Sequence, residues 1–215
     1  MDLSFLKWIE HAGFLFNIGG KNVYVDPYKI SGEWPKADVI FVTHTHFDHF
    51  SEPDIRKIAA AGTKFVAPKE TAGKIQGRDV LAVEPGKRYS IDGIGFETAP
   101  AYNISKEFHP KANGWVGYVI DAGGKRVYQA GDTDNVPEMK ALDVDLALLP
   151  IGGHYTMDIE EAIAATKSIR AKAYAPMHYR ALLGKEGAKK AEEKFASSVP
   201  NAIILEQAQE PHYSL

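Results

Sequence analysis

The stretch that decides the fold is "VIFVTHTHFDHF", residues 39–50. It begins with a run of apolar residues that is typical of a strand covered on both faces. The run ends in four polar side chains, His44, His46, Asp48 and His49. Neutral imidazole and carboxylate are ligands that Zn²⁺, Mn²⁺ and iron accept, so this H-x-H-x-D-H spacing predicts a metal site at the end of a core strand. The alternative is a loop that caps a helix, but capping uses Ser, Thr, Asp or Asn rather than three histidines.

The segments around this stretch are typical of strands, turns and short helices. Gly19 and Gly20 predict a hairpin turn between "GFLFNI" and "KNVYVD". Pro53 stands at a plausible first helical turn, and "DIRKIAAAG" predicts a helix that stops at Gly62. The run "KFVAP", residues 64–68, predicts the next strand. We therefore expect the first half of the chain to hold several strands followed by strand–helix units.

The second half repeats this order. Strands are expected at "IGFETAPAYN", residues 94–103, and on both sides of a hairpin turn at residues 121–124. Helices are expected over residues 158–169 and 185–198, the second with solvent on most of its surface, and a last strand at residues 202–206. Two halves of this kind predict one domain, residues 1–215, in which two sheets pack face to face with helices outside.

Composition limits the possible functions. The chain of 215 residues has a formal charge of −3, which argues against a nucleic-acid binder that uses a basic face. It has no cysteine, so a metal site must use His, Asp, Glu and water. The first residues lack the pattern of a signal peptide, and no apolar run approaches the roughly 18 residues of a membrane span. We expect a cytoplasmic protein that acts on a small molecule, with neither nucleic acid nor membrane as partner. The oligomeric state is left open.

Three further ligand candidates also follow predicted strands. Asp26 ends "VYVD", Asp132 follows "VYQAG", and His178 ends "AYAPMH". Taken singly, an aspartate at a strand end is usually a turn residue. Active-site groups cluster at strand ends in layered folds, so their recurrence beside H-x-H-x-D-H favours a shared site.

The motifs "THTHFDH", "GDTD" and "PMHY", in this order, resemble those of the metallo-β-lactamase superfamily. The resemblance covers essentially the whole chain and implies an α+β fold, a four-layer αββα sandwich with a two-metal site at one edge. It implies these roles: His44 and His46 on the first metal; Asp48, His49 and His178 on the second; Asp132 as the bridge; and Asp26 as a buried carboxylate that orients ligands.

One position departs from the family pattern. The family usually supplies a third histidine to the first metal from a strand end before the bridging aspartate, and Asn103 stands at that place. His109 lies six residues further on and is the only histidine between His49 and His154. We expect His109 to replace the third ligand or to work beside it. The alternative is that His109 lies on a solvent-facing loop and that the first metal is one ligand short.

The segments "WIEHAGFLF" and "LLPIGGHYTM" resemble the branch of small, single-domain hydrolases that includes the ascorbate-6-phosphate lactonases. This resemblance implies that His11 and the loop of residues 152–156 border the pocket, with His154 as a rim candidate. Each of these two histidines could equally be a structural residue that only makes hydrogen bonds.

The expected mechanism is hydrolysis by a hydroxide bound to two metals, of which zinc is the first choice and manganese or iron the alternatives. Asp48 would steer a proton, and His109 or His154 would assist as further catalytic groups. We expect an ester-type bond, a lactone or a phosphodiester, in a small anionic substrate. Lys106, Lys111 and Arg180 could hold an anion, although plain solvated charge is commoner.

Two other functions stay open on the sequence. A di-iron redox protein of this fold would carry an acidic residue at the place of His46, so the histidine favours a hydrolase. A non-catalytic metal-binding or sensor protein would be favoured if Asn103 left the first site incomplete.

Overall fold

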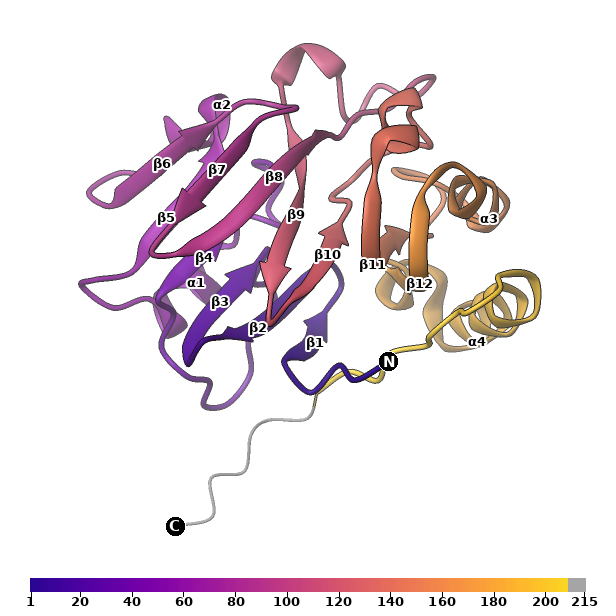
Figure 1. Ribbon diagram of the computed structural model, residues 1–215, viewed down its shortest axis with the longest axis horizontal. Coiled ribbons are helices and arrows are strands. Elements are labelled where there is room, and N and C mark those ends of the chain that lie inside the picture. Colours follow the sequence, from indigo (N-terminus) through magenta and orange to yellow (C-terminus); the bar gives the residue numbers. More distant parts are fainter. Residues whose placement is uncertain (209–215) are drawn as a thin grey trace. The chain divides into compact units, whose positions relative to one another are not determined.

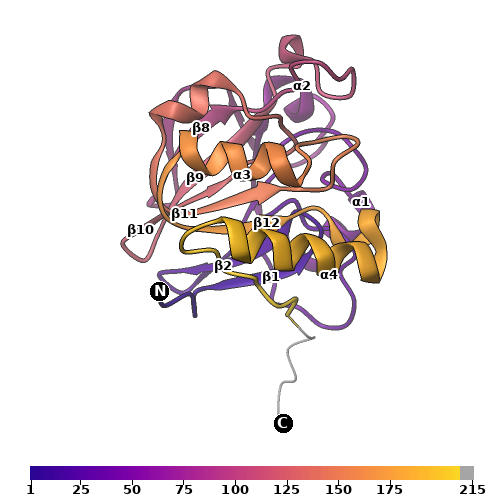
Figure 2. The same cartoon turned by 90° about the vertical axis from the view of Figure 1, so that its right-hand side faces the viewer.

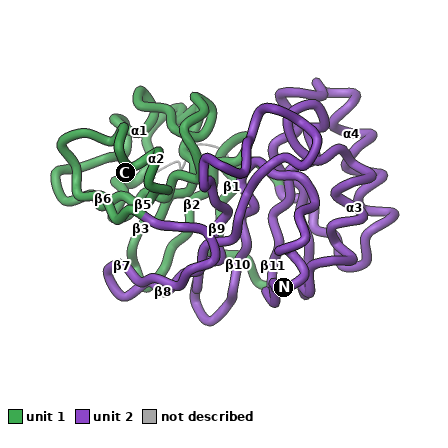
Figure 3. The backbone as a smooth tube through the Cα atoms, turned by 90° about the horizontal axis from the view of Figure 1, so that it is seen from above, with its two compact units in different colours: residues 1–82, 206–215 green, residues 83–205 purple. Residues whose placement is uncertain are grey.

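The computed structural model describes residues 1–208 and divides them into two compact units, which Figure 3 colours separately. Unit 1 comprises residues 1–82 together with residues 206–208, and unit 2 comprises residues 83–205. Each unit contains one six-stranded sheet (Figure 1). The prediction of two sheets is therefore confirmed, and the prediction of a single domain stays a prediction.

The sheet of unit 1 has its strands in sequence order. These are β1 (Leu6–Glu10), β2 (Gly13–Ile18), β3 (Lys21–Val25), β4 (Val39–Phe41), β5 (Lys64–Pro68) and β6 (Asp79–Val83). The pairs β1–β2 and β2–β3 are antiparallel, and β3–β4 and β4–β5 are parallel. As a result β1, β3, β4 and β5 run in the same direction, and the residues that follow them lie at one edge of the sheet.

The predicted hairpin and core strand of unit 1 are confirmed. Gly19 and Gly20 both have positive φ and join β2 to β3, which is the backbone that a two-residue hairpin needs. Strand β4 is fully buried, as its apolar run predicts for a strand with parallel neighbours on both sides. One face of the sheet packs against Ile55 and Ile58 of helix α1 (Glu52–Ile58). A short helix, α2 (Lys69–Ala72), follows β5.

Helix α1 ends earlier than the sequence predicts. Gly62 was expected to stop it, but Ala59 already has an extended backbone and closes the last turn by donating its N–H to the carbonyl of Ile55. The side chain of Thr63 accepts a hydrogen bond from the N–H of Ala60 and donates to the carbonyl of Ala37. These bonds give the backbone after Ala59 an alternative to the helix.

The carboxylate of Asp54 ties α1 to the loop before it. It accepts hydrogen bonds from the N–H groups of Lys29 and Ile30, from the Ser51 hydroxyl, and from Lys57. Burial by itself would raise the pKa of Asp54, but the hydrogen bonds from Lys57, Ser51 and Lys29 outweigh it and hold the pKa below its usual range. The ionised form therefore stabilises the folded protein.

We expect this carboxylate to make stability pH-dependent. A lowered pKa contributes stability that is present above the unfolded pKa of about 3.9 and is lost as pH falls through the folded value. Urea unfolding at pH 7, 4 and 3 should show that the free energy of unfolding declines less steeply with falling pH in Asp54→Asn than in the wild type. At pH 7 the free energy of unfolding of the variant should be lower by about 1–3 kcal/mol. Glu33→Gln, at an exposed loop position, is the control and should follow the wild type. Equal slopes in wild type and Asp54→Asn would contradict this expectation.

The sheet of unit 2 has the order β12-β11-β10-β9-β8-β7. Its strands are β7 (Arg88–Ile91), β8 (Ile94–Pro100), β9 (Val116–Ala122), β10 (Lys125–Gln129), β11 (Asp143–Pro150) and β12 (Arg170–Met177). The pairs from β7 to β10 are antiparallel, whereas β10–β11 and β11–β12 are parallel. Strands β8, β10, β11 and β12 therefore share one direction and end at one edge.

Two helices cover the β11–β12 end of this sheet. These are α3 (Ile159–Ser168) and α4 (Arg180–Ser198), which lie side by side in Figure 2. Helix α3 starts with a capping box, in which Asp158 accepts from the N–H of Glu161 and the Glu161 side chain accepts from the N–H of Asp158. Helix α4 starts five residues before its predicted start, with a non-helical kink at Gly184. None of the helices within residues 1–208 combines the length and apolar character needed to cross a membrane.

Two strand predictions in unit 2 are wrong. Strand β8 ends at Pro100, so Asn103 lies in the following loop. Ala101 still donates to the carbonyl of Trp115, but the N–H of Tyr102 donates to the Thr133 hydroxyl and that of Asn103 to the carbonyl of His109. The expected last strand, residues 202–206, is reduced to one bridge between Tyr174 and Ala202. There the chain makes two backbone hydrogen bonds, from Tyr174 to Asn201 and from Ile203 to Tyr174, and then leaves the sheet edge.

Candidate metal centre

The ligand candidates of unit 1 follow strands that end at the same edge of its sheet. His11 follows β1, Asp26 follows β3, and the H-x-H-x-D-H segment follows β4. We call the five candidates on these loops the histidine cluster: His11, His44, His46, Asp48 and His49. The structure thus brings together every site residue that the sequence placed in the first half of the chain.

Asp26 is fully buried and its carboxylate organises the cluster. One oxygen, Oδ1, accepts from the Thr43 N–H at 2.8 Å. The other, Oδ2, accepts from the Thr43 hydroxyl at 2.7 Å and lies 2.8 Å from Nδ1 of His49. Because a carboxylate can only accept, Nδ1 of His49 must carry the proton. The lone pair of His49 is therefore on Nε2, where a metal can use it.

Thr43 fixes the tautomer of His44 in a similar way. Its hydroxyl donates to Asp26, so its oxygen accepts from Nδ1 of His44, 2.9 Å away. This bond places the lone pair of His44 on Nε2, as in His49. The rings of His44 and His49 are 4.1 Å apart, and Nε2 of His44 lies 3.1 Å from Nδ1 of His46. Sequence reasoning missed Thr43, although its place between the core strand and the first histidine was a signal.

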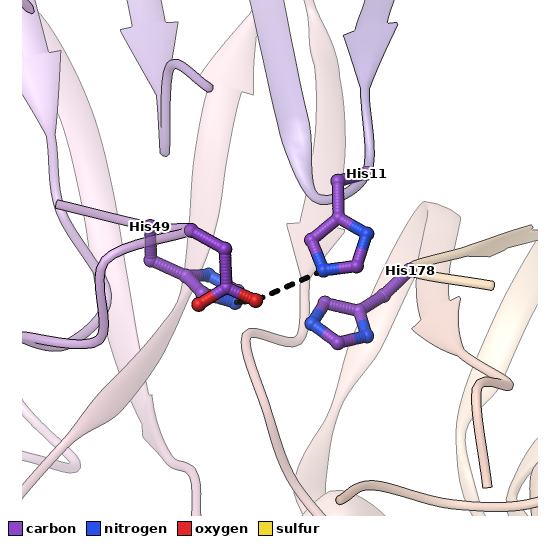
Figure 4. Close-up of side chains that lie close together, drawn as sticks. His11, His49 and His178 are labelled. Carbon is purple, nitrogen blue, oxygen red and sulfur yellow. Dashed lines mark hydrogen bonds and ion pairs between the residues drawn. The ribbon is translucent and has the colours of Figure 1, made fainter. Parts of the chain in front are cut away.

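His11 and Asp48 are in contact at the edge of the cluster. Nε2 of His11 lies 3.0 Å from Oδ2 of Asp48, and this contact is the dashed line in Figure 4. Nε2 of His49 lies 3.9 Å from the same oxygen. Ligand atoms of these three residues lie within 4.8 Å of one another, a spacing that would suit a common cation. Asp48 keeps 19% of its side chain exposed, whereas His11 is buried.

Three site residues have a left-handed backbone. The φ angles are 55° at His11, 45° at Asp26 and 57° at His178. Non-glycine residues adopt this conformation at a cost of order 1–3 kcal/mol, and it persists only where the surroundings fix it. Each of the three follows directly after a strand at the edge of its own sheet, so the surroundings hold a strained backbone at each of these site residues.

The ligand candidates of unit 2 follow β8, β10 and β12 and meet at one carboxylate. Oδ2 of Asp132 lies 3.2 Å from Nε2 of His109 and 3.2 Å from Nε2 of His178. All three side chains are at most a few per cent exposed. We call this group the Asp132 cluster. The expectation that His109 lies at the site agrees with this geometry, whereas the alternative of a solvent-facing loop does not.

Asn103 fixes the orientation of His109. Its Nδ2 donates to Asp134 at 2.9 Å and to the carbonyl of Tyr155 at 3.0 Å, so its other atom, Oδ1, is the acceptor. That oxygen accepts from the N–H of His109 and lies 2.9 Å from its Nδ1. Nδ1 must therefore carry the proton, and the lone pair is on the Nε2 that faces Asp132. The asparagine at the third-ligand place thus holds the histidine that the sequence proposes as its replacement.

Asp134 is a site residue that sequence reasoning missed. Its carboxylate accepts from Asn103, from the N–H of Ile104 and from Lys106. The spacing was a signal, because Asp134 stands two residues after Asp132 in "GDTD". It stabilises the loop that carries Asn103 and holds Lys106 away from the role of anion binder.

The three cations named from the sequence all have carboxylate partners within unit 2. Lys106 contacts Asp134 and Glu161, Lys111 contacts Glu138, and Arg180 contacts Glu192. Burial by itself would lower the pKa of Lys106, but Asp134 and Glu161 outweigh it and raise that pKa above its usual value. These cations are therefore engaged in ion pairs.

His154 lies on the loop after β11 and is exposed. Its ring packs against Phe108 at 5.2 Å and Tyr155 at 4.6 Å. The structure places His154 in this aromatic group, and its catalytic role stays a prediction.

Gly152 lets the chain pass close to His178. A Cβ at Gly152 would lie 2.4 Å from the carbonyl oxygen of His178 and 2.6 Å from the Leu182 side chain. We expect Gly152→Ala to shift His178, to lower the free energy of unfolding by about 1–3 kcal/mol and to weaken metal binding. Urea unfolding and metal titration measure these effects. Gly62→Ala is the control, because a Cβ there meets nothing within 4 Å. A Gly152→Ala variant with wild-type stability would contradict the expected clash.

Comparisons with known proteins show which family the chain belongs to. The family model described as a beta-lactamase superfamily domain matches residues 5–178. The chain is 32% identical over 223 residues to a UPF0173 metal-dependent hydrolase of Thermoplasma volcanium, covering 98% of this chain and 99% of the relative. A crystal structure assigned as a metal-dependent hydrolase from Parabacteroides distasonis has 30% identity and a TM-score of 0.81, with 94% and 93% covered. Igni18, a metallo hydrolase from Ignicoccus hospitalis, has 27% identity and a TM-score of 0.76, with 95% of each chain covered.

The fold and these matches define a metal-dependent hydrolase of the metallo-β-lactamase superfamily, so the α+β fold class expected from the sequence is confirmed. Within the superfamily, the chain belongs to the UPF0173 family of metal-dependent hydrolases. Likeness to the ascorbate-6-phosphate lactonase branch stays a prediction.

Proposed function

We propose that this protein hydrolyses an ester-type bond in a small molecule with the help of two divalent metal ions. The observation that supports it is the chemistry of the donor set. In both units, buried histidines donate Nδ1–H to an oxygen of Asp26, Thr43 or Asn103 and keep the lone pair on Nε2. Histidines whose tautomer is fixed in this way, with carboxylates nearby, are typical ligands of a transition metal.

The ligand assignment follows the family resemblance. We propose His44, His46 and His109 for one metal, Asp48, His49 and His178 for the other, and Asp132 for both. Histidine and carboxylate ligands suit zinc first, with manganese or iron as alternatives. When bound, such ions supply an activated water near neutral pH and a Lewis acid for the bond under attack.

The chain's own residues supply positioning and proton handling. Asp26, Thr43 and Asn103 orient the imidazoles from behind, at hydrogen-bond distance. Asp48 is the best-placed group to hold a proton, because its carboxylate is partly exposed and its Oδ2 is 3.0 Å from His11. His11 can donate to Asp48 when that carboxylate is ionised and so keep it oriented.

The first experiment is the metal content per chain of protein purified without added metal, in wild type and in His109→Ala. We expect close to two metals in wild type and a value near one in the variant, because His109 is proposed as the third ligand of the first metal. Leu183→Ala, an exposed side chain on α4, is the control and should keep the wild-type content.

Other results would change the proposal in defined ways. Two metals in both proteins would move His109 from metal ligand to substrate handling. Fewer than two in wild type would contradict the two-metal reaction and favour a single-metal or non-catalytic protein. Hydrolysis of γ-butyrolactone and of bis(4-nitrophenyl) phosphate by the metal-loaded enzyme would then distinguish a carboxylic ester from a phosphodiester substrate.

A further inference from the structure

Exposed apolar side chains gather on the loops that carry the ligand candidates. Phe47, with 73% of its surface exposed, stands between His46 and Asp48. Phe108 directly precedes His109 and is 38% exposed. Apolar groups of this size are usually buried, and an exposed one directly beside ligand candidates indicates a surface that binds a ligand.

In unit 2, Phe108 packs with two neighbouring rings. We call these three side chains the aromatic surface: Phe108, His154 and Tyr155. The ring centroids are 5.2 Å apart for Phe108–His154, 4.7 Å for Phe108–Tyr155 and 4.6 Å for His154–Tyr155. The interplanar angles are 52°, 74° and 81°, so Phe108 and His154 are tilted relative to each other and both meet Tyr155 edge to face. This packing holds a concentrated apolar face open to solvent.

The aromatic surface is tied to a ligand candidate by one side chain. Asn103 donates to the carbonyl of Tyr155 and, through Oδ1, accepts from both the backbone and the ring of His109. Phe108 is the residue before His109. The hydrogen bonds of Asn103 therefore fix the aromatic surface relative to the ring of His109. A substrate bound to this surface would be held in a defined position relative to that histidine.

Unit 1 presents a smaller counterpart. The rings of Phe47 and Tyr28 are 6.0 Å apart at an interplanar angle of 76°, and the ring of Tyr28 lies 5.9 Å from that of His11. An exposed aromatic ring thus adjoins ligand candidates in each unit, on loops that are unrelated in sequence.

On the loops of unit 2, the two lysines near the aromatic surface are already paired with carboxylates. Lys106 is paired with Asp134 and Glu161, and Lys111 with Glu138. A substrate that carried a phosphate or carboxylate would have to compete with these side-chain carboxylates. An uncharged apolar group meets no such competition.

We propose that the substrate is an uncharged carboxylic ester or lactone with an aromatic ring, or a group as flat and apolar, and that Phe108 and Tyr155 bind that ring. This inference rests on the proposed hydrolytic function and makes its substrate class narrower. Phe108 and Tyr155 are its specificity-determining residues, and His154 completes the surface.

The test compares γ-phenyl-γ-butyrolactone with γ-butyrolactone on the metal-loaded enzyme. We expect kcat/KM to be at least about tenfold higher for the phenyl compound. Phe108→Ala and Tyr155→Ala should each reduce that ratio toward one. Leu183→Ala, whose exposed fraction of 37% matches that of Phe108, should keep the ratio. Circular dichroism checks that each variant folds.

A second measurement separates this inference from the hydrolytic function. Benzamide and acetamide, two neutral probes without an ester bond, are titrated into the metal-loaded protein by NMR. Benzamide should bind at least about tenfold tighter, and Phe108→Ala should remove the difference. If neither lactone is hydrolysed but benzamide binds more tightly than acetamide, the proposed lactone hydrolysis is wrong and the proposed aromatic binding surface is supported. Equal binding of the two amides, or a lactone ratio that survives both replacements, would overturn the inference.

Discussion

Replacing Asp26 by asparagine is expected to weaken metal binding by about 10- to 100-fold, the usual effect of removing a carboxylate that orients metal ligands. The physical reason is a change of tautomer. In the wild type Oδ2 of Asp26 accepts from His49, and Oδ1 accepts from the Thr43 N–H. An asparagine must keep its carbonyl oxygen toward that N–H, so its NH₂ group would face His49.

Facing a donor, Nδ1 of His49 must accept, and the proton of the ring moves to Nε2. Nε2 is then no longer available as a ligand atom. Asp26→Asn also leaves a buried network with too many donors, which should cost about 1–3 kcal/mol of stability. The position itself tolerates asparagine, because Asn adopts a positive φ as readily as Asp.

The ¹⁵N chemical shifts of the His49 ring report the tautomer, and calorimetric titration reports the metal affinity. Asp38→Asn is the matched control, because Asp38 also accepts a backbone N–H, from Asn22, but lies on the surface. It should change neither quantity. An Asp26→Asn variant with Nδ1 of His49 still protonated and unchanged affinity would show that Asp26 has only a packing role.

Replacing Asn103 by leucine is expected to lower the free energy of unfolding by about 3 kcal/mol or more. Leucine has a similar size, so the main loss is of hydrogen bonds. Buried Asn103 makes four of them with its side chain, to His109 twice, to Asp134 and to Tyr155. Each buried partner left unsatisfied costs about 1–3 kcal/mol.

The same replacement should also weaken metal binding, because His109 loses the oxygen that fixes its tautomer. Urea unfolding with and without metal separates the two effects: the metal-free proteins report the lost hydrogen bonds, and the added stability with metal reports the affinity. Asn17→Leu, at an exposed position of β2, is the control and should stay within about 0.5 kcal/mol of wild type. A metal-dependent stability increment equal to that of wild type in Asn103→Leu would argue against a role for Asn103 in orienting His109.

Much of the fold could be predicted from local patterns. The buried run of β4, the Gly19–Gly20 turn and the helix expected over residues 158–169 each depend on residues that are neighbours in sequence, and each was correctly predicted. The predictions failed where a distant partner decides. Helix α1 ends at Ile58 because Thr63 bonds Ala37 across the fold, a contact that no local pattern contains.

The same distinction between local patterns and distant contacts applies to the candidate site. The sequence by itself indicated which residues are candidate metal ligands, because H-x-H-x-D-H, Asp132 and His178 are recognisable by residue type and by their place after strands. Only the tertiary structure decided which ring nitrogen of each histidine carries the proton. The protons of His44, His49 and His109 are placed by Thr43, Asp26 and Asn103. Asp26 and His49 are 23 residues apart in the chain, and a hydrogen bond at that separation depends on the parallel pairing of β3 with β4, which a pattern of neighbours does not encode.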